Sequence, residues 1–138
     1  MVEICKILLV DDDPDDRAIV KDALAKLNAA NAICCAENGE VALGLLNDNA
    51  NAIHSLCLIV LDLNMPRMNG TQTLKNLKSD KRFQHIPVII YSTSINPLEK
   101  EKCMMLGAHS YITKPISYRE SMDTAQLFLD LCNSKSFV

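Results

Sequence analysis

The sequence predicts an α/β protein, namely a five-stranded parallel sheet, doubly wound, with five helices. Short apolar runs of strand length alternate five times with segments whose apolar residues recur at helical spacing. The strand-like runs are nearly continuous in apolar residues, as is typical of buried strands in a parallel sheet. This alternation favours βαβ units, whose right-handed crossovers place helices on both faces of the sheet.

The composition limits the class of protein. The chain of 138 residues suits one domain, and its apolar (49%) and charged (22%) fractions are those of a globular protein. A net charge of −3 argues against nucleic-acid or anionic-membrane binding as the main function. No apolar run approaches the ~20 residues of a membrane span, and the N-terminus lacks a signal-peptide pattern. We therefore expect a cytoplasmic protein with no membrane partner.

The first strand and helix are predicted at the N-terminus. Residues 4–10 form an almost continuous apolar run, which indicates a buried strand. Asp13 followed by Pro14 is a strong helix start, with Asp as the N-cap and Pro at the first helical position. Asp15 and Asp16 complement the helix dipole. The helix carries apolar residues at helical spacing up to Asn28: Ile19, Val20, Ala23, Leu24 and Leu27.

The next two strand–helix pairs are separated by polar loops. Residues 32–36 predict a strand, and residues 40–46 a helix that follows an Asn-Gly turn. A polar loop, longer than the fold needs, is expected at 47–51. We assign no function to the polar segment from Asn47 to His54. Residues 56–61 predict a third strand that ends at a carboxylate. After a loop rich in turn formers, residues 71–78 predict a helix.

The last two strand–helix pairs complete the pattern. Residues 87–91 predict a strand opened by Pro87, where a missing N–H is tolerated. Asn96 caps a helix that ends at Gly107, a residue suited to the left-handed conformation after a helix. Residues 109–112 predict the fifth strand. A Ser-Tyr-Arg-Glu capping box at 117–120 opens the final helix.

The six cysteines do not form a recognisable metal or redox motif. None belongs to a CxxC pair, and most lie in apolar stretches. We therefore expect reduced core cysteines, as in a cytoplasmic protein. They are Cys5, Cys34, Cys35, Cys57, Cys103 and Cys132.

Carboxylates follow two of the predicted strands at the point where each strand ends. Asp11 and Asp12 follow the first strand, and Asp62 follows the third. In a parallel sheet these ends lie on one edge, where open α/β sheets bind ligands. Converging carboxylates repel each other unless a cation intervenes, and Mg²⁺ prefers such oxygen ligands. N-capping and the helix dipole suffice to explain Asp13, Asp15 and Asp16, which we interpret as a solvated helix start.

The fourth and fifth strands add a hydroxyl and an ammonium to the same edge. Ser92 follows the fourth strand and Lys114 the fifth. Taken alone, Ser92 would be interpreted as a turn former and Lys114 as a surface lysine. Together with Mg²⁺ they would bind the oxygens of a phosphoryl group. A central aspartate could then act as nucleophile toward phosphorus, because Asp carboxylates form acyl phosphates.

These residues, taken in order, resemble a known family. The carrying motifs are Leu8-Leu9-Val10-Asp11-Asp12-Asp13, Leu61-Asp62-Leu63-Asn64-Met65-Pro66 with Asn69-Gly70, Pro87-Val88-Ile89-Ile90-Tyr91-Ser92, and Gly107-Ala108 before Tyr111-Ile112-Thr113-Lys114-Pro115. The chain is similar to a single-domain response-regulator receiver of two-component phosphorelays, close in layout to the bacterial chemotaxis receiver. The resemblance implies a flavodoxin-like strand order of 2-1-3-4-5. It also implies a receiver domain at 1–132, a short C-terminal tail at 133–138 and no output domain.

The resemblance assigns roles to the site residues. Asp62 would be the phosphoacceptor, and Lys114 would pair with the phosphoryl group. Ser92 would be the switch hydroxyl, with the neighbouring Thr93 as the alternative, and Tyr111 would be the aromatic that rotates inward. The peptide bond between Lys114 and Pro115 would be cis. The Mg²⁺ ligands would be Asp11 (mainly through water), Asp12, Asp62 and the backbone carbonyl of Asn64.

The implied function is signalling rather than turnover of a substrate. A sensor histidine kinase or phosphotransfer protein would donate the phosphoryl group to Asp62 in a Mg²⁺-dependent reaction. The chain would signal through a downstream protein, or act as a phosphate shuttle or sink, as a monomer or weak homodimer.

Three alternatives have specific requirements. A haloacid-dehalogenase-type phosphatase wants a second Asp where Asn64 stands. A flavodoxin-like FMN carrier needs a phosphate-binding loop after the first strand, where the aspartates would repel phosphate. A degenerate receiver would act as an interaction module alone, and the complete set of Asp11, Asp12, Asp62 and Lys114 argues against it.

Overall fold

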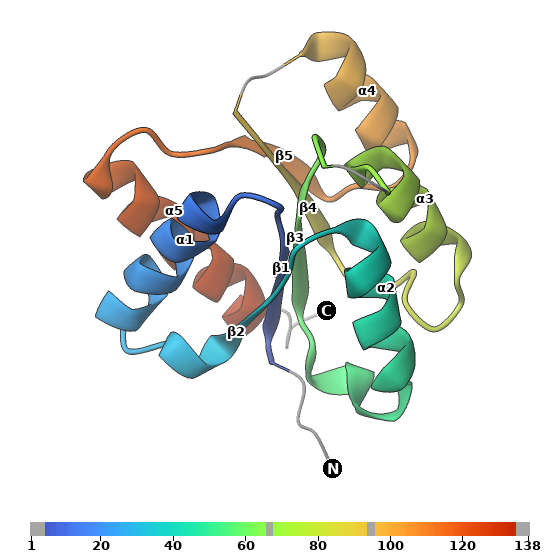
Figure 1. The fold of residues 1–138 in the computed structure, drawn as a ribbon, viewed down its shortest axis with the longest axis horizontal. Coiled ribbons are helices and arrows are strands. Elements are labelled where there is room, and N and C mark those ends of the chain that lie inside the picture. Colours follow the sequence, from blue (N-terminus) through green and yellow to red (C-terminus); the bar gives the residue numbers. More distant parts are fainter. Residues whose placement is uncertain (1–4, 66–67, 94–95, 135–138) are drawn as a thin grey trace.

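The computed structural model describes residues 5–65, 68–93 and 96–134 of the chain (Figure 1). Within these residues the strands are β1 (Ile7–Val10), β2 (Ile33–Ala36), β3 (Leu58–Asp62), β4 (Val88–Ser92) and β5 (Ser110–Thr113). The α-helices are α1 (Pro14–Lys26), α2 (Gly39–Asp48), α3 (Gly70–Ser79), α4 (Pro97–Met105) and α5 (Tyr118–Ser134). Two short 3-10 helices are η1 (Ala30–Ala32) and η2 (Ala50–Ser55).

The five strands form one parallel sheet in the order β2-β1-β3-β4-β5, which confirms the predicted fold. Helices α1 and α5 cover one face of this sheet, and α2, α3 and α4 cover the other (Figure 1). In the central pairing, Val10 of β1 lies opposite Leu61 of β3. The residues that follow these two strands therefore emerge side by side at the carboxyl edge of the sheet.

Two apolar layers fix this register. Along β1, Ile7 and Leu9 pack in the layer beneath α1 and α5, whereas Leu8 and Val10 pack in the layer beneath α2, α3 and α4. Strands β1, β3 and β4 are buried along their whole length. Because a slip of one residue would exchange the two faces of a strand, this two-sided burial holds the strand ends in place.

The helix ends follow the predicted capping chemistry. The Asp13 carboxylate accepts hydrogen bonds from the backbone N–H of Asp15 (2.8 Å) and Asp16 (3.4 Å), with Pro14 at the first helical position. Asn96 caps α4 in the same way. Gly107 ends α4 with a φ of +104°, a left-handed conformation that favours glycine. No helix in the described part of the chain is both long enough and apolar enough to cross a membrane.

Several predicted local features are wrong. The polar stretch at 47–51 is not an open loop, because α2 continues to Asp48 and η2 begins at Ala50. The amide of Asn49 donates to the carbonyl of Leu45, so these polar side chains satisfy a helix end. Helix α5 ends at Ser134, and the remainder of the predicted tail, residues 135–138, lies outside the described residues. The Lys114–Pro115 bond is trans, the form that X–Pro bonds prefer by about 0.5–1 kcal/mol.

The cysteines also differ from the prediction. Cys5 is disulfide-bonded to Cys34, and Cys57 to Cys132, with Cα–Cα distances of 5.8 and 5.4 Å. These spacings lie in the usual range for a disulfide. Sequence spacing could not show them, since parallel pairing of β1 with β2, and docking of α5 near the start of β3, bring the pairs together. The expected reduced state holds for Cys35 and Cys103, which are free thiols.

Candidate functional site

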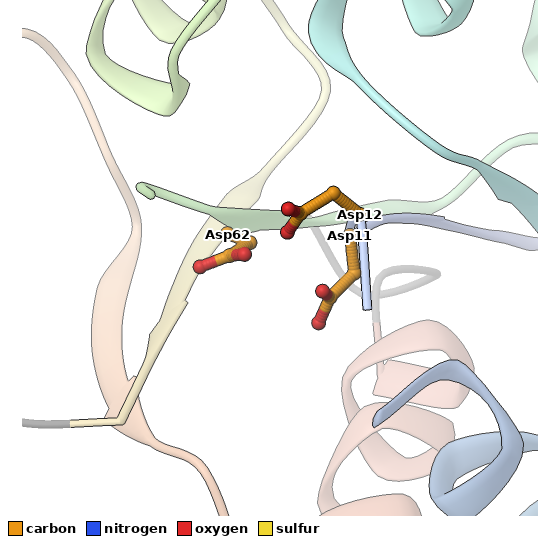
Figure 2. A group of neighbouring side chains, drawn as sticks. All are labelled: Asp11, Asp12 and Asp62. Carbon is orange, nitrogen blue, oxygen red and sulfur yellow. The ribbon is translucent and has the colours of Figure 1, made fainter. Parts of the chain in front are cut away.

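Three carboxylates converge at the carboxyl edge of the sheet, as predicted. Asp11 and Asp12 follow the last residue of β1, and Asp62 is the last residue of β3. Figure 2 shows Asp62 beside the other two side chains at the end of β1. One carboxylate oxygen from each residue lies within 4.8 Å of the others. Asp11 and Asp62 are buried, whereas Asp12 is exposed, so the cluster faces solvent on one side.

Asp11 is held firmly in this cluster. Its Oδ1 accepts a hydrogen bond from the backbone N–H of Asp13 (3.0 Å), and the guanidinium of Arg17 donates to its carbonyl (2.7 Å). Its Oδ2 lies 2.8 Å from the ammonium nitrogen of Lys114 in an ion pair. This ion pair joins two buried side chains, since Asp11 is fully buried and Lys114 is nearly so. A buried carboxylate needs a compensating cation, and the Lys114 ammonium supplies it here.

Lys114 is the cation at the centre of the site. Its Nζ lies 2.7 Å from Asp16, 2.8 Å from Asp11 and 3.7 Å from Asp62. The ring of Tyr91 lies beneath it, with its centroid 5.6 Å from Nζ. Burial alone would lower the pKa of Lys114, but the neighbouring carboxylates outweigh burial and raise it. The lysine is therefore charged throughout the neutral pH range.

Asp62 has an unusual protonation equilibrium. Burial raises the pKa of its carboxyl to about 7, and the charges of Asp11 and Asp12 add to this increase. The Lys114 ammonium and a hydrogen bond from the backbone N–H of Asn64 oppose it. Without a further cation, the site thus opposes full ionisation of Asp62 near neutral pH.

The carboxylates fit a hard divalent cation. An octahedral Mg²⁺ with bonds of ~2.0–2.1 Å brings its ligand oxygens to within about 3–4 Å of one another. One oxygen from each of Asp11, Asp12 and Asp62 already lies within 4.8 Å of the other two, which is close to this separation. A cation there would stabilise the ionised form of Asp62, whose pKa is raised first by burial and then by the charges of Asp11 and Asp12.

The hydroxyl and aromatic side chains of the prediction lie on β4 and β5. Ser92 is buried at the end of β4, whereas the neighbouring Thr93 is exposed. This difference in burial favours Ser92 over Thr93 as a hydroxyl directed into the site. Tyr111 is buried, and its hydroxyl donates to the carboxylate of Glu99 on α4 (3.2 Å). Burial raises the pKa of Tyr111, with a hydrogen bond from Ser92 acting in the opposite direction.

The start of α3 makes a close backbone approach to the end of β3 at Gly70. The N–H of Gly70 donates to the carbonyl of Leu63 (3.0 Å). A Cβ at position 70 would collide with the carbonyl oxygen of Asp62 and lie 2.6 Å from the Cα of Leu63. Because both atoms are backbone, they cannot move aside without displacing Asp62 or α3.

We expect Gly70→Ala to displace the end of β3 and to lower stability by about 1–3 kcal/mol, the usual cost of overpacking a tight site. Urea unfolding followed by far-UV circular dichroism measures this loss. Gly44→Ala is a matched control, since a Cβ there meets no atom within 4 Å and alanine favours the α2 helix. Equal stability of the two variants would contradict the close-approach argument.

Two residues of the site were not predicted in these roles. Asp16 was interpreted as part of a solvated helix start, yet its carboxylate binds the Lys114 ammonium. Glu99 of the first turn of α4 had no predicted role at the site, yet it accepts a hydrogen bond from the Tyr111 hydroxyl. The contact of Asp16 with Lys114 left no signal in the sequence, because it depends on how α1 lies beside the end of β5. Sequence alone held no signal for Glu99, which depends on the packing of α4 on β5.

Comparison with known proteins agrees with this geometry. A family model described as the response regulator receiver domain matches residues 7–126. The chain belongs to this receiver family. It is therefore a receiver domain of the two-component response-regulator type, and domains of this family are generally not turnover enzymes.

Similar curated proteins include both short and long relatives. Chemotaxis protein CheY1 of Helicobacter pylori is 35% identical over 112 residues, which are 81% of this chain and 86% of the relative. A probable cyclic di-GMP phosphodiesterase of Vibrio cholerae is 36% identical over 113 residues, 82% of this chain. The chain spans only 24% of that phosphodiesterase, so the similarity covers a receiver-sized part of a larger protein.

Similar solved structures are also response regulators. The phosphorylated cyanobacterial phytochrome response regulator RcpA superimposes with a TM-score of 0.81 at 28% identity, covering 95% of this chain and 96% of RcpA. A receiver domain from Rhodospirillum rubrum gives a TM-score of 0.79 at 29% identity, covering 94% of each chain. The Mn²⁺-bound form of response regulator Rcp1 gives 0.78 at 25% identity, with 94% of each chain covered.

Proposed function

We propose that this receiver domain accepts a phosphoryl group on Asp62. The proposal depends on one observation. The buried carboxylate of Asp62 lies at one edge of the sheet together with two further carboxylates and the buried ammonium of Lys114. Aspartate carboxylates attack phosphorus to form acyl phosphates, and such reactions depend on positioning and charge neutralisation. A structural neighbour, RcpA, was solved in a phosphorylated state, which supports phosphorylation as the function of this fold.

The chain's own residues have separate tasks in this reaction. A carboxylate oxygen of Asp62 attacks phosphorus in line, an O–P bond forms, and the bond from phosphorus to the donor's imidazole nitrogen breaks. Lys114, 3.7 Å from Asp62, binds an oxygen of the transferred group, and the Ser92 hydroxyl donates to another. The imidazole leaves with the electron pair of the broken bond.

A divalent metal is part of the proposal. Asp11, Asp12, Asp62 and the backbone carbonyl of Asn64 would hold Mg²⁺, which neutralises charge on the phosphoryl oxygens when bound. Receiver domains bind Mg²⁺ at an acidic pocket of this kind, and the Mn²⁺-bound form of Rcp1 supports a metal here. The convergence of three carboxylate oxygens within 4.8 Å of one another is the local reason for assigning the metal to this site.

The signal is proposed to pass from the site to the face formed by α4, β5 and α5. Movement of Ser92 toward a phosphoryl group would alter its contact with Tyr111, whose hydroxyl also binds Glu99 of α4. Tyr111 is already buried in this structure, so the change would act on an inward-facing ring. This is a switch between two packings that local charge biases.

The proposed partners follow from this chemistry. The donor is a histidine kinase or a phosphotransfer protein that presents a phosphohistidine. The output is a downstream protein that reads the α4–β5–α5 face, or a second phosphotransfer protein if the chain serves as a shuttle.

The test is labelling of the purified protein by acetyl phosphate, read by intact mass. We expect a gain of one phosphoryl group in Mg²⁺ and none when a chelator removes the metal. A two-dimensional NMR spectrum with Mg²⁺ and beryllofluoride should show shifts that spread from Asp62 to Tyr111. An unchanged mass together with an unchanged spectrum would leave a receiver that acts only as an interaction module.

A further inference from the structure

Asp16 makes a contact that its place in the sequence does not require. It is the third residue of α1, where the Asp13 cap and the helix dipole already account for an acidic residue. Its carboxylate nevertheless points toward the site, where it lies 2.7 Å from Lys114 Nζ and accepts a hydrogen bond from it. The Asp16 side chain is 25% exposed and that of Lys114 is 9% exposed, so the pair is partly shielded from water.

This contact determines where the ammonium lies. An ammonium group has three N–H donors and no acceptor. Of the three carboxylates around Lys114, Asp16 and Asp11 are in direct contact, whereas Asp62 is farther away at 3.7 Å. The proposed phosphoacceptor is thus the weakest of the three partners in the unphosphorylated protein.

We propose that Asp16 is a positioning residue that competes with the phosphoryl group on Asp62 for the Lys114 ammonium. The inference rests on the proposed function, and it adds a residue that opposes phosphorylation of Asp62. A phosphoryl group brings about −1.5 to −2 charges and three acceptor oxygens. Drawing the ammonium toward these oxygens, from 3.7 Å at Asp62, would lengthen its contact with Asp16, which is now 2.7 Å. Asp16 therefore disfavours the phosphorylated state and limits how tightly the site holds a phosphoryl group.

Asp11 does not act as the same kind of competitor. It is fully buried, is fixed by the Asp13 N–H, and is a proposed metal ligand. A metal bound to Asp11 would reduce its pull on Lys114, because the metal takes up its charge. Asp16 lies outside the group of carboxylates that can meet at one ion among the described residues. It would keep its full charge for the ammonium when metal is present.

The experiment compares Asp16→Asn with Asp15→Asn. Both variants remove one acidic charge from the first turn of α1, but Asp15 is exposed and forms no ion pair among the described residues. The probe is beryllofluoride with Mg²⁺, titrated by two-dimensional NMR. Replacing a charge-assisted hydrogen bond with a neutral one predicts about three- to tenfold tighter beryllofluoride binding for Asp16→Asn. Asp15→Asn should stay within about twofold of wild type, and Asp16→Glu, which keeps the charge, should restore the wild-type affinity.

A second measurement reports on the contact itself. The Nζ resonance of Lys114 in the protein without beryllofluoride should shift in Asp16→Asn and not in Asp15→Asn. Equal behaviour of the two variants in both measurements, or weaker beryllofluoride binding by Asp16→Asn, would overturn the role of Asp16. Failure of the wild-type protein to bind beryllofluoride at all would instead overturn the proposed function and this inference with it.

Discussion

Asp62→Asn is expected to abolish Mg²⁺-dependent labelling by acetyl phosphate. The amide removes the nucleophilic oxygen while keeping the size of the side chain. Other carboxylates of the cluster do not substitute for it, since Asp11 is fully buried against Lys114 and Asp12 is exposed at the rim. We expect the labelled fraction to fall by at least about a hundredfold, the scale seen when a group that acts directly on the reacting atom is removed. Intact mass spectrometry measures the fraction directly.

The control for Asp62→Asn is a stability measurement, which shows whether the variant still folds. Burial and neighbouring aspartates already raise the pKa of Asp62 to about 7, so removing its charge relieves a cost rather than creating one. The variant should therefore unfold in urea at the same concentration as wild type or at a higher one. Asp48→Asn, an exposed substitution at the end of α2, should label as wild type does. Undiminished labelling of Asp62→Asn would refute the assignment of the phosphoacceptor.

The sheet and the position of the site could be predicted from sequence because both depend on local patterns. Continuous apolar runs define the strands, and parallel crossovers force their carboxyl ends to one edge. Asp11, Asp12 and Asp62 follow such runs directly, so their convergence requires only the strand order. Burial patterns in β1, β3 and β4 then fix the register without further information.

The features that sequence missed depend on contacts between distant elements. Asp16 reaches Lys114 across 98 positions of the chain, and Cys57 reaches Cys132 across 75. Neither pairing leaves a periodic trace, because each depends on how α1 or α5 docks against the sheet. The polar stretch at 47–51 was predicted as a loop, but it contains the end of α2, where the side chain of Asn49 satisfies a helix carbonyl in place of water.

These contacts make Lys114 as important to stability as to the proposed chemistry. Its ammonium offsets the charge of Asp11, which is fully buried, and part of the charges of Asp16 and Asp62. Removing one partner of a buried ion pair costs about 3–5 kcal/mol, because the remaining charge is left uncompensated. We expect Lys114→Met to lose stability on this scale at pH 8 in the absence of metal, as measured by urea unfolding.

The loss should depend on pH in a defined direction. Burial and the neighbouring aspartates raise the pKa of the Asp62 carboxyl in the folded protein to about 7, above its usual value of 3.8, and loss of the Lys114 charge raises this pKa further. A group whose pKa is higher in the folded state binds more protons there than in the unfolded state, so stability falls as pH rises between the two values. The difference between wild type and Lys114→Met should therefore be smaller at pH 5 than at pH 8.

Two comparisons separate this effect from simple loss of a lysine. Lys100→Met removes an exposed ammonium from α4 and should change stability by no more than about 0.5 kcal/mol at either pH. Millimolar Mg²⁺ should restore part of the stability of Lys114→Met, because a cation bound by Asp11, Asp12 and Asp62 replaces the missing charge. A pH-independent loss equal to that of Lys100→Met would show that Lys114 does not compensate the buried carboxylates. A large loss that Mg²⁺ leaves unchanged would show that these carboxylates do not share one metal.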